Sequence, residues 1–531
     1  MRRDVERAAR AGADAVELRL DFLARPPDAE ELRALLAAPR PEAIVTFRPV
    51  RQGGLYDGDE SARLRVLQFA ADAGAEWIDV EGDVPTASRP HGAKLILSHH
   101  DFEKCPADLD DIVARLAAAG PAVVKVAFAA AGPEDAFRAL DVVRNLSPRR
   151  STLALAMGEA GIASRVLAAK LGAFGTFAAL AHGAESAPGQ PTLDEMKRLY
   201  RWDSLGPATG VFGVVGCPVG HSMSPAIHNA AFAAAGVDGV YLPLLVAPGR
   251  EAFGRLMDGI LSRAWLGWRG LSVTIPHKEN ALAYVGAARC DELARRIGAV
   301  NTITIGPGGE LRGDNTDYAA AIDALCAALK NRDAPYFSAA ETGPLADSLP
   351  SGGGKTGCVP IFQGIRGDTP RLRAAVLKGR SVAVLGAGGA ARAIVAALVH
   401  YGAEVTIYNR TVSRAEKLAA EFACRAAPAD EATLARIAQE IVINGTSVGM
   451  HPDFGSCPLP AIPPAVRVVF DTIYNPVETL LLKRARQAGC VCVTGLEMFI
   501  NQAAAQFELW TGRPAPRDVM RRVVVERLGS G

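Results

Sequence analysis

Short apolar runs alternate with amphipathic stretches through the first 200 residues. The runs that are typical of buried strands are 15–20, 43–47, 77–80, 93–97, 122–128, 153–156 and 174–177. The segments with apolar residues at helical spacing include 61–73, 108–119, 134–146 and 162–171. This repeated order of strand and helix predicts an α/β fold whose parallel strands are joined by helical crossovers.

Seven such strands are one short of a (β/α)8 barrel of the TIM type. The chain opens on a helical pattern at 5–11, so we expect the missing strand to be the first one. Residues 1–205 should therefore form a barrel domain that lacks strand 1. After a break at 201–209, the run 211–215 starts a new α/β region.

Composition narrows the class of protein. The 531 residues carry a formal net charge of +1, so nothing favours nucleic acid as a partner, and no apolar stretch is long enough to span a bilayer. The nine cysteines show no zinc spacing, which argues against a metal site and for a reducing compartment. The first ten residues lack the apolar core of a signal peptide.

A dinucleotide fingerprint follows the apolar run 381–385. Gly386, Gly388 and Ala391 form the G-x-G-x-x-A pattern ahead of a helical stretch, which allows a tight turn and a close approach of backbone to a pyrophosphate. The residues expected to bind the cofactor here are Gly386, Ala387, Gly388, Gly389 and Ala390.

The next strand, 404–408, indicates which cofactor is bound. NAD-binding proteins usually place an acid at this point, whereas here the chain continues with Asn409, Arg410 and Thr411, and Arg414 follows. Guanidinium groups and a hydroxyl suit a 2′-phosphate. The sequence therefore predicts NADP(H).

Lys125 lies inside the apolar run 122–128, where a lysine is costly unless it faces a polar site. Burial lowers the pKa of an amine, and a neutral amine in a barrel mouth is what Schiff-base catalysis needs. Glu17, Arg19 and Asp21 alternate along one strand and should all face the barrel interior. Other polar residues, at or just beyond the carboxyl ends of their strands where such folds place their sites, are Arg48, His100 and Arg165.

Six motifs of this half resemble the type I 3-dehydroquinate dehydratases: ELRLD (17–21), TFR (46–48), SHHDF (98–102), VVKVA (123–127), MGEAGIASR (157–165) and SAPGQ (186–190). The resemblance implies that Lys125 forms an imine with the substrate ketone and that His100 moves protons. The residues expected to line the substrate pocket are Glu17, Arg19, Asp21, Arg48, Gln52, Met157, Arg165, Phe177, Ser186 and Gln190, with Arg165 on the carboxylate.

The half departs from that family at Gln52, where the family usually has a glutamate before two glycines. Glutamine lacks the charge that would hold His100 protonated or oriented. A barrel without its first strand also has two unpaired edges.

The second region carries HSMSP (221–225), VTIPHK (273–278), GAVNT (298–302) and DNTD (314–317). Ser222 and Ser224 offer hydroxyls before a helix and suit a carboxylate ligand. Lys278 and Asp317 could together position and protonate a carbonyl oxygen while hydride arrives.

These motifs resemble shikimate dehydrogenase, which makes Lys278 and Asp317 the catalytic pair. The residues that the resemblance places on the substrate are Ser222, Ser224, Thr274, Asn301, Tyr474 and Gln502. It implies an α/β substrate domain over 209–318 and 494–531, and a Rossmann NADP domain over 319–493. Residues 331–370 are rich in Gly, Pro and Ser and lack periodicity, so we expect an exposed insertion there. Ser272 replaces a common asparagine.

Fused in this order, the halves resemble the plant-type bifunctional enzymes of the shikimate pathway. We expect dehydration of 3-dehydroquinate followed by reduction of 3-dehydroshikimate, with small-molecule substrates and no implied protein partner. Two alternatives stay open: a quinate dehydrogenase, against which the paired serines argue, and a binding or regulatory protein with an inactive dehydratase-like scaffold. The plant resemblance implies a chloroplast, although this chain shows no transit peptide; a cytoplasmic location is the alternative.

Overall fold

The structure is a computed structural model that describes residues 1–330 and 369–529. The expected insertion at 331–370 lies outside the described residues except for its last two, which begin a helix. The chain divides into two compact units, Met1–Tyr284 with Ile303–Arg312, and Val285–Thr302 with Gly313–Gly531.

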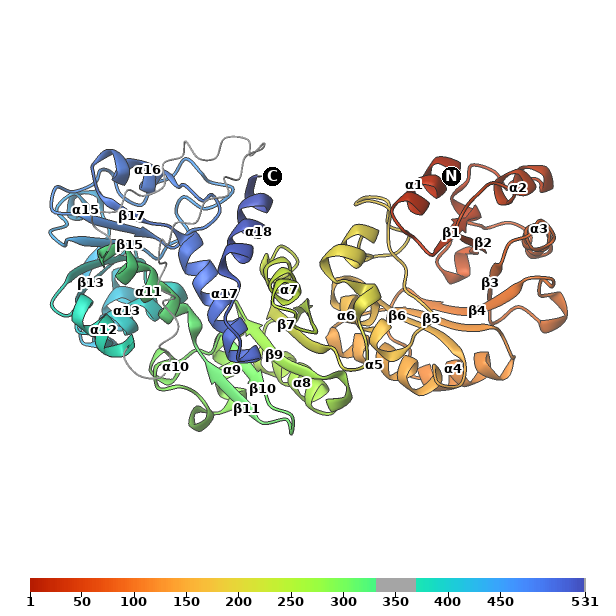
Figure 1. The fold of residues 1–531 in the computed structure, drawn as a ribbon, viewed down its shortest axis with the longest axis horizontal. Coiled ribbons are helices and arrows are strands. Elements are labelled where there is room, and N and C mark those ends of the chain that lie inside the picture. The colour runs from red at the N-terminus through yellow and green to blue at the C-terminus, as the bar shows by residue number, and fades with distance from the viewer. Residues whose placement is uncertain (331–368, 530–531) are drawn as a thin grey trace, which may run out of the picture. The chain divides into compact units, whose positions relative to one another are not determined.

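The first unit begins with a sheet of six parallel strands, labelled β1 to β6 in Figure 1. The strands lie side by side in the order in which they occur along the chain. The strands are β1 (Ala15–Arg19), β2 (Glu42–Thr46), β3 (Trp77–Glu81), β4 (Lys94–Asp101), β5 (Val123–Ala129) and β6 (Ser151–Met157). The helices are α1 (Arg2–Arg10), α2 (Ala29–Leu36), α3 (Glu60–Asp72), α4 (Leu109–Ala118), α5 (Pro133–Leu146) and α6 (Ile162–Leu167).

The expected seventh strand, 174–177, is wrong: the structure forms no strand there, and the sheet is an open half-barrel of six strands. The apolar residues of this run are used for packing instead. Phe174 contacts the Trp77 ring edge-on, with ring centroids 4.8 Å apart. Phe177 packs against the apolar cluster on the inner face of the sheet, to which Trp77 belongs. The hydrophobic pattern therefore reported packing against the first sheet, which a partly exposed irregular segment provides without a ladder of hydrogen bonds.

The inner face of this sheet has an apolar floor and a polar layer above it. The floor consists of Ile44, Trp77, Ile96, Val123 and Leu153, one residue from each of five strands. Side chains two residues further along a strand point to the same face, so a second layer stands above this floor towards the strands' carboxyl ends. That layer contains Thr46, Asp79, Ser98, Lys125 and Leu155.

A second sheet, most of which lies in the same unit, has the order β11-β10-β9-β7-β8. Its strands are β7 (Gly210–Gly216), β8 (Gly239–Leu245), β9 (Trp268–Val273), β10 (Thr302–Ile305) and β11 (Leu311–Asp314). The nearby helices are α7 (Ser224–Ala234), α8 (Arg250–Leu261) and α9 (Lys278–Val285).

Contacts join the two sheet regions of this unit. Helix α5 contacts α8, and α6 contacts β8. Arg263 donates from Nη2 and Nε to the carboxylate of Asp141 at 2.6 and 3.0 Å, which is a bidentate ion pair. The segment from the first sheet to the second is therefore held by side-chain contacts as well as by the continuous backbone.

The second unit contains six parallel strands in the order β14-β13-β12-β15-β16-β17. This is the doubly wound order of a dinucleotide-binding sheet. The strands are β12 (Ser381–Leu385), β13 (Glu404–Asn409), β14 (Arg425–Pro428), β15 (Ile441–Asn444), β16 (Val468–Asp471) and β17 (Val491–Val493).

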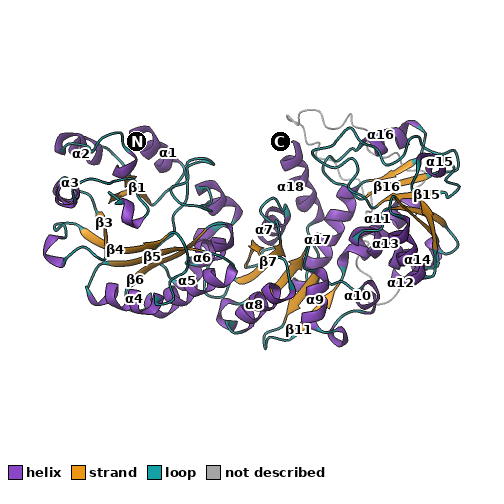
Figure 2. Cartoon of the chain, turned by 180° about the vertical axis from the view of Figure 1, so that it is seen from behind, coloured by secondary structure: helices purple, strands orange, loops and turns teal. Residues whose placement is uncertain are grey.

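Helices cover both faces of that sheet, as Figure 2 shows from behind. Val382 and Val384 pack in one core with α11 and α13, while Ala383 and Leu385 pack in another with α16. The helices of this unit are α10 (Glu292–Ile297), α11 (Thr316–Lys330), α12 (Thr369–Leu377), α13 (Gly389–His400), α14 (Val412–Phe422), α15 (Glu431–Leu434), α16 (Leu480–Gln487), α17 (Gly495–Thr511) and α18 (Arg517–Gly529).

Candidate active sites

A pocket opens at the carboxyl ends of the first six strands. Its lining includes every pocket residue expected from the first half except Asp21. The expected residues that line it are Glu17, Arg19, Arg48, Gln52, His100, Lys125, Met157, Arg165, Phe177, Ser186 and Gln190. They come from the strands and from the loops after them, so side chains far apart in the sequence meet because parallel strands end at one edge.

Lys125 lies at the bottom of this pocket on β5, and its side chain is 6% exposed. Its amine donates to Asp79 at 2.7 Å and lies 3.7 Å from Glu17. The same amine lies 4.3 Å from the centre of the Phe177 ring. The surroundings of the amine are therefore two carboxylates and an aromatic face, so the lysine of this apolar strand faces polar groups.

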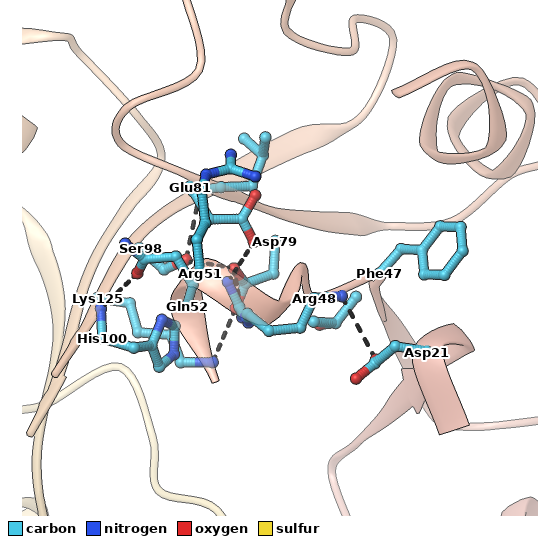
Figure 3. Close-up of polar contacts among 12 residues, drawn as sticks. Asp21, Phe47, Arg48, Arg51, Gln52, Asp79, Glu81, Ser98, His100 and Lys125 are labelled. Carbon is cyan, nitrogen blue, oxygen red and sulfur yellow. Dashed lines mark hydrogen bonds and ion pairs between the residues drawn. The ribbon is translucent and has the colours of Figure 1, made fainter. Parts of the chain in front are cut away.

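Asp79 and Arg48 form the centre of a buried charge network (Figure 3). Arg48 bonds Asp79 at 2.9 Å and Glu81 at 2.7 Å, and Ser98 donates to Asp79 at 2.6 Å. Burial alone would raise the pKa of Asp79, but the Arg48 and Lys125 cations outweigh it and hold the pKa well below its usual value. Asp79 is therefore a permanent negative charge beside the Lys125 amine.

Glu81 has the opposite shift. Burial raises its pKa, although Arg48 and Arg63 both favour the charged form. Arg63 is fully buried, pairs with Glu81 at 2.7 Å, and donates to the main-chain oxygen of Phe47 at 2.7 Å. Arg63 therefore links Glu81 of β3 to the main chain at Phe47, the residue before Arg48.

His100 stands on β4 and its ring lines the pocket. Burial, then the Arg48 and Lys125 cations, lower its pKa well below 6.5, so the ring is neutral at neutral pH. Gln52 accepts a hydrogen bond from the His100 main-chain N–H at 2.7 Å. The glutamine thus contacts the backbone of the histidine, and it brings no charge to the ring.

Arg165 is 1% exposed on α6, and burial lowers its pKa to about 10, so it stays cationic at neutral pH. Its Nε has no hydrogen-bond partner in the part of the chain that the structure describes. An unpaired buried guanidinium nitrogen is costly unless a ligand completes it. The arginine is therefore placed to receive an anionic group.

The prediction for Asp21 is wrong in its position. The strand ends at Arg19, and Asp21 lies in a 3-10 turn (Leu20–Phe22) where alternation no longer applies. Its carboxylate accepts from Arg19 at 2.7 Å and from the Leu55 N–H at 3.2 Å, outside the pocket lining. Asp21 therefore anchors the loop that follows β2.

Sequence reasoning missed Asp79 and Glu81, because the run 77–80 was interpreted only as apolar. The signal was available: both carboxylates lie on the face of β3 that also carries Trp77 of the floor. A buried strand with two acids on one face has the same pattern that singled out Glu17 and Arg19.

In the second sheet region, Ser222 and Ser224 share one turn at the start of α7. Ser222 Oγ accepts from the Ser224 N–H at 3.3 Å. Buried Tyr241 donates to Ser272 at 2.6 Å, and burial raises the pKa of this phenol. Hydrogen bonds to Ser224 and Ser272 oppose that rise, so the departure at Ser272 still leaves a polar partner beside the serine turn.

Thr274 and Lys278 follow β9 in the same unit. The Thr274 methyl lies 2.5 Å from the position a Cβ would take on Gly216, so a side chain there would displace Thr274. Lys278 is the first residue of α9.

The other expected residues lie in the second unit. Asn301 accepts from the Thr316 N–H at 2.7 Å and from the Thr302 hydroxyl at 2.8 Å, which fixes the start of α11. Asp317 is in the first turn of that helix. Tyr474 stacks on Phe499 with centroids 4.4 Å apart, and burial raises its pKa. Gln502 lies on α17.

The glycine turn after β12 leaves room for a nucleotide. Gly386 has φ +102°, and a Cβ there would meet Thr446 at 2.9 Å, so this position requires glycine. At Gly388 and Gly389 a Cβ would meet no atom within 4 Å, which leaves open space at the start of α13. Free N–H groups at a helix N-terminus suit phosphate.

At the end of β13, Arg410, Thr411 and Arg414 are exposed. Neither arginine forms an ion pair with any residue within the described ranges. Their guanidinium groups therefore remain accessible to an anionic ligand.

Known protein families match this chain in two blocks. Residues 1–207 match the type I 3-dehydroquinases, and residues 214–303 match the substrate binding domain of shikimate dehydrogenase. Residues 371–451 match shikimate / quinate 5-dehydrogenase, and 495–525 match the shikimate 5′-dehydrogenase C-terminal domain. A bifunctional 3-dehydroquinate dehydratase/shikimate dehydrogenase from Arabidopsis thaliana, named as chloroplastic, is 35% identical and covers 98% of this chain and 81% of its own length.

The chain belongs to the bifunctional 3-dehydroquinate dehydratase/shikimate dehydrogenases. The dehydrogenase half is also 38% identical to an NADP(+) shikimate dehydrogenase of Methanosarcina acetivorans, which covers 60% of this chain and 98% of that protein. A solved shikimate 5-dehydrogenase of Thermus thermophilus with NADP(H) and shikimate is 32% identical, covers 60% of this chain and 100% of its own, and has a TM-score of 0.45.

The predictions of an α/β dehydratase–dehydrogenase fusion and of NADP(H) as its cofactor are confirmed. The bifunctional enzyme combines a lyase half with an NADP-linked oxidoreductase half and acts on small molecules. The glycine turn and the accessible arginines after β13 fit a dinucleotide with a 2′-phosphate. Across the described parts of the chain, no helix is both long and apolar enough to cross a membrane.

Proposed function

We propose that Lys125 is the Schiff-base lysine of the dehydratase half and that His100 is its proton carrier. The observation that carries the proposal is the convergence of Lys125, His100 and Arg165 on one pocket. Lys125 Nζ attacks the ketone carbon of 3-dehydroquinate, and water leaves as the imine forms. The imine draws electron density from the adjacent carbon, so that a proton there becomes acidic.

His100 is the group that accepts this proton. Its pKa lies well below 6.5, so the ring nitrogen is free to act as a base at neutral pH. The protonated ring then delivers the proton to the departing hydroxyl, and hydrolysis of the imine returns Lys125. The Arg48 and Lys125 cations, which lower the pKa of His100, favour this second transfer.

Arg165 and Asp79 have supporting roles in the proposal. Arg165 binds the substrate carboxylate, which satisfies a guanidinium that lacks a partner on Nε among the residues described. Asp79 remains ionised 2.7 Å from Lys125 and stabilises positive charge on the nitrogen. A cationic iminium nitrogen therefore takes the place of the ammonium without a change in the network's total charge.

In the dehydrogenase half we propose Lys278 and Asp317 as the pair that holds and protonates the carbonyl oxygen of 3-dehydroshikimate. NADPH supplies the hydride when bound. The hydroxyls of Ser222 and Ser224 bind the carboxylate, and Thr274, Asn301, Tyr474 and Gln502 bind the remaining substrate oxygens. Arg410, Thr411 and Arg414 bind the 2′-phosphate, and Gly386–Ala390 face the pyrophosphate. A chloroplast location is proposed from the name of the Arabidopsis relative.

Borohydride trapping tests the dehydratase assignment. Incubating the protein with 3-dehydroquinate and sodium borohydride should add the reduced substrate mass to the peptide that contains Lys125. Lys125→Ala should abolish trapping and dehydration but leave NADP-dependent shikimate oxidation within about twofold of the parent, because the two activities use different residues. Lys104→Ala, which removes an exposed lysine of the same half, is the matched control. Dehydration by Lys125→Ala near the parent rate would refute the Schiff base.

A further inference from the structure

The helix that carries Arg165 ends against the dehydrogenase substrate region. Helix α6 has only six residues, and all of them are buried. The main-chain oxygens in the last turn of a helix have no partner within the helix. The Trp202 indole N–H donates to the main-chain oxygen of Arg165 at 3.1 Å, so the segment after 200 supplies one of the missing partners.

Lys170 provides a second attachment, in the 3-10 turn Ala169–Leu171 directly after α6. It is 3% exposed, and its amine donates to the main-chain oxygens of Pro207 at 2.6 Å and Thr209 at 2.8 Å. Thr209 is the residue before β7, so Lys170 ties the end of α6 to the first strand of the second sheet.

The neighbourhood of the amine is closed by a third segment. A Cβ on Gly267, the residue before β9, would lie 3.6 Å from Lys170 Nζ. Lys170 forms no ion pair with a carboxylate among the residues described, so main-chain oxygens satisfy its buried charge. A buried lysine is unfavourable unless it is fully hydrogen-bonded, and a methionine of similar length would fill the same space at less cost. The charge therefore needs a reason beyond packing.

We propose that Lys170, assisted by Trp202, is a positioning residue of the dehydratase reaction: it fastens α6 to the dehydrogenase substrate region and thereby holds Arg165 in the dehydratase pocket. The Arg165 Nε has no partner in the described chain that could hold the side chain in place, so its position depends on the backbone of α6. A displacement of about 1 Å at such a group is enough to weaken its interaction with a bound anion severely. The inference rests on the proposed role of Arg165.

The test compares Lys170→Met with Lys197→Met in the full-length protein. Lys197 bonds Asp203 at 2.9 Å near the same linker and pairs with Asp14 rather than with α6, so it is the matched control. We expect Lys170→Met to raise the dehydratase KM about tenfold with kcat within about twofold, because ground-state and transition-state binding of the carboxylate weaken together. Both dehydrogenase constants, and all constants of Lys197→Met, should stay within about twofold.

Trp202→Phe is a milder second variant, because it keeps an aromatic ring and removes only the donor to Arg165. It should raise the dehydratase KM about threefold. The Arg165→Met background tests the route of the effect: with the guanidinium gone, Lys170→Met should change the dehydratase KM by less than about twofold further.

The outcomes separate this inference from the function on which it rests. Absence of borohydride trapping at Lys125 in the parent would overturn the proposed dehydratase function itself. Trapping and turnover in the parent, with an unchanged dehydratase KM in Lys170→Met and Trp202→Phe, would overturn only the positioning role. The positioning role would also be overturned if Lys170→Met raised the dehydratase KM by the same factor in the Arg165→Met background as in the parent. It would be overturned as well if Lys170→Met lowered both activities equally, because Lys170 would then act on the general stability of the protein.

Discussion

Asp79→Asn is the most informative single change in the dehydratase half. The parent carboxylate is fully buried and contacts Lys125 at 2.7 Å, Arg48 at 2.9 Å and Ser98 at 2.6 Å. Asparagine has nearly the same shape, but only one of its two terminal atoms accepts a hydrogen bond. The other terminal atom becomes a donor that faces a cation. Lys125 or Arg48 therefore loses its partner at this position, although Arg48 keeps Glu81.

The expected cost follows from these interactions. Losing one hydrogen bond to a charged group costs about 1.5–3 kcal/mol, and leaving a buried charge without its partner costs about 3–5 kcal/mol. Since one amide oxygen remains and Arg48 keeps a second carboxylate, we expect about 3 kcal/mol. At about 2–4 °C per kcal/mol for a domain of this size, the melting temperature of the dehydratase half should fall by about 6–12 °C.

The pH dependence of this difference has a definite sign. The pKa of Asp79 is lowered by folding, so its contribution is present above the unfolded-state value of about 3.9 and is lost as the pH falls through the folded-state value. The difference in stability between parent and Asp79→Asn should therefore stay constant from about pH 6 to 8 and become smaller only at acid pH.

Scanning calorimetry at pH 7 measures the effect, with Asp57→Asn as the control because it makes the same chemical change at an exposed site. The control should melt within about 2 °C of the parent. If Asp79→Asn melted at the same temperature as the parent or higher, Lys125 and Arg48 would not need Asp79 to compensate for the burial of their charges. The reasoning from a broken buried pair would then be wrong.

Three further predictions concern activity. Arg410→Gln with Arg414→Gln should weaken NADPH binding by about 1–3 kcal/mol for each charge-assisted hydrogen bond removed and leave NADH binding nearly unchanged; equal losses in titrations with both cofactors would assign these arginines to the fold. Ser224→Gly should relax the preference for shikimate over quinate, whose hydroxylated carbon beside the carboxylate needs more room, and a parent that oxidises both equally well would contradict this. Gln52→Glu should raise the low pKa of His100 by adding a nearby negative charge, so the acid limb of the dehydratase rate profile should move to higher pH; an unmoved limb would mean that residue 52 acts only through the backbone of His100.

The alternation of side chains between the two faces of a strand predicted the pocket residues correctly as far as the strand extended. Glu17 and Arg19 line the pocket as expected, but the rule was extended one step too far at Asp21, where a 3-10 turn redirects the side chain. The run 174–177 failed for a different reason. Its apolar residues are needed to cover Trp77 and the floor, and a hydrophobic pattern does not say whether the backbone pairs with a neighbour.

The electrostatic setting of the site could not be obtained from spacing. The spacing predicted that Lys125 faces a polar site and that Glu17 lies in it, but it did not identify Asp79 of β3, the carboxylate nearest to the amine. Such contacts depend on the register of several strands at once. The domain partition and the roles of Lys278 and Asp317, which lie in different compact units, stay predictions.

The ion pair between Asp141 and Arg263 bears on how such a fusion can diverge. One partner belongs to the dehydratase half and the other to the dehydrogenase half, so each gene segment carries half of a bidentate contact. A recombination event at the linker would preserve the reading frame and both sets of catalytic residues, yet would separate the two partners of this contact. Because both side chains are partly exposed, the pair is worth about 1 kcal/mol at most, so chimaeras that lose it should fold with slightly lower stability than those that keep an acid–arginine pair at these positions.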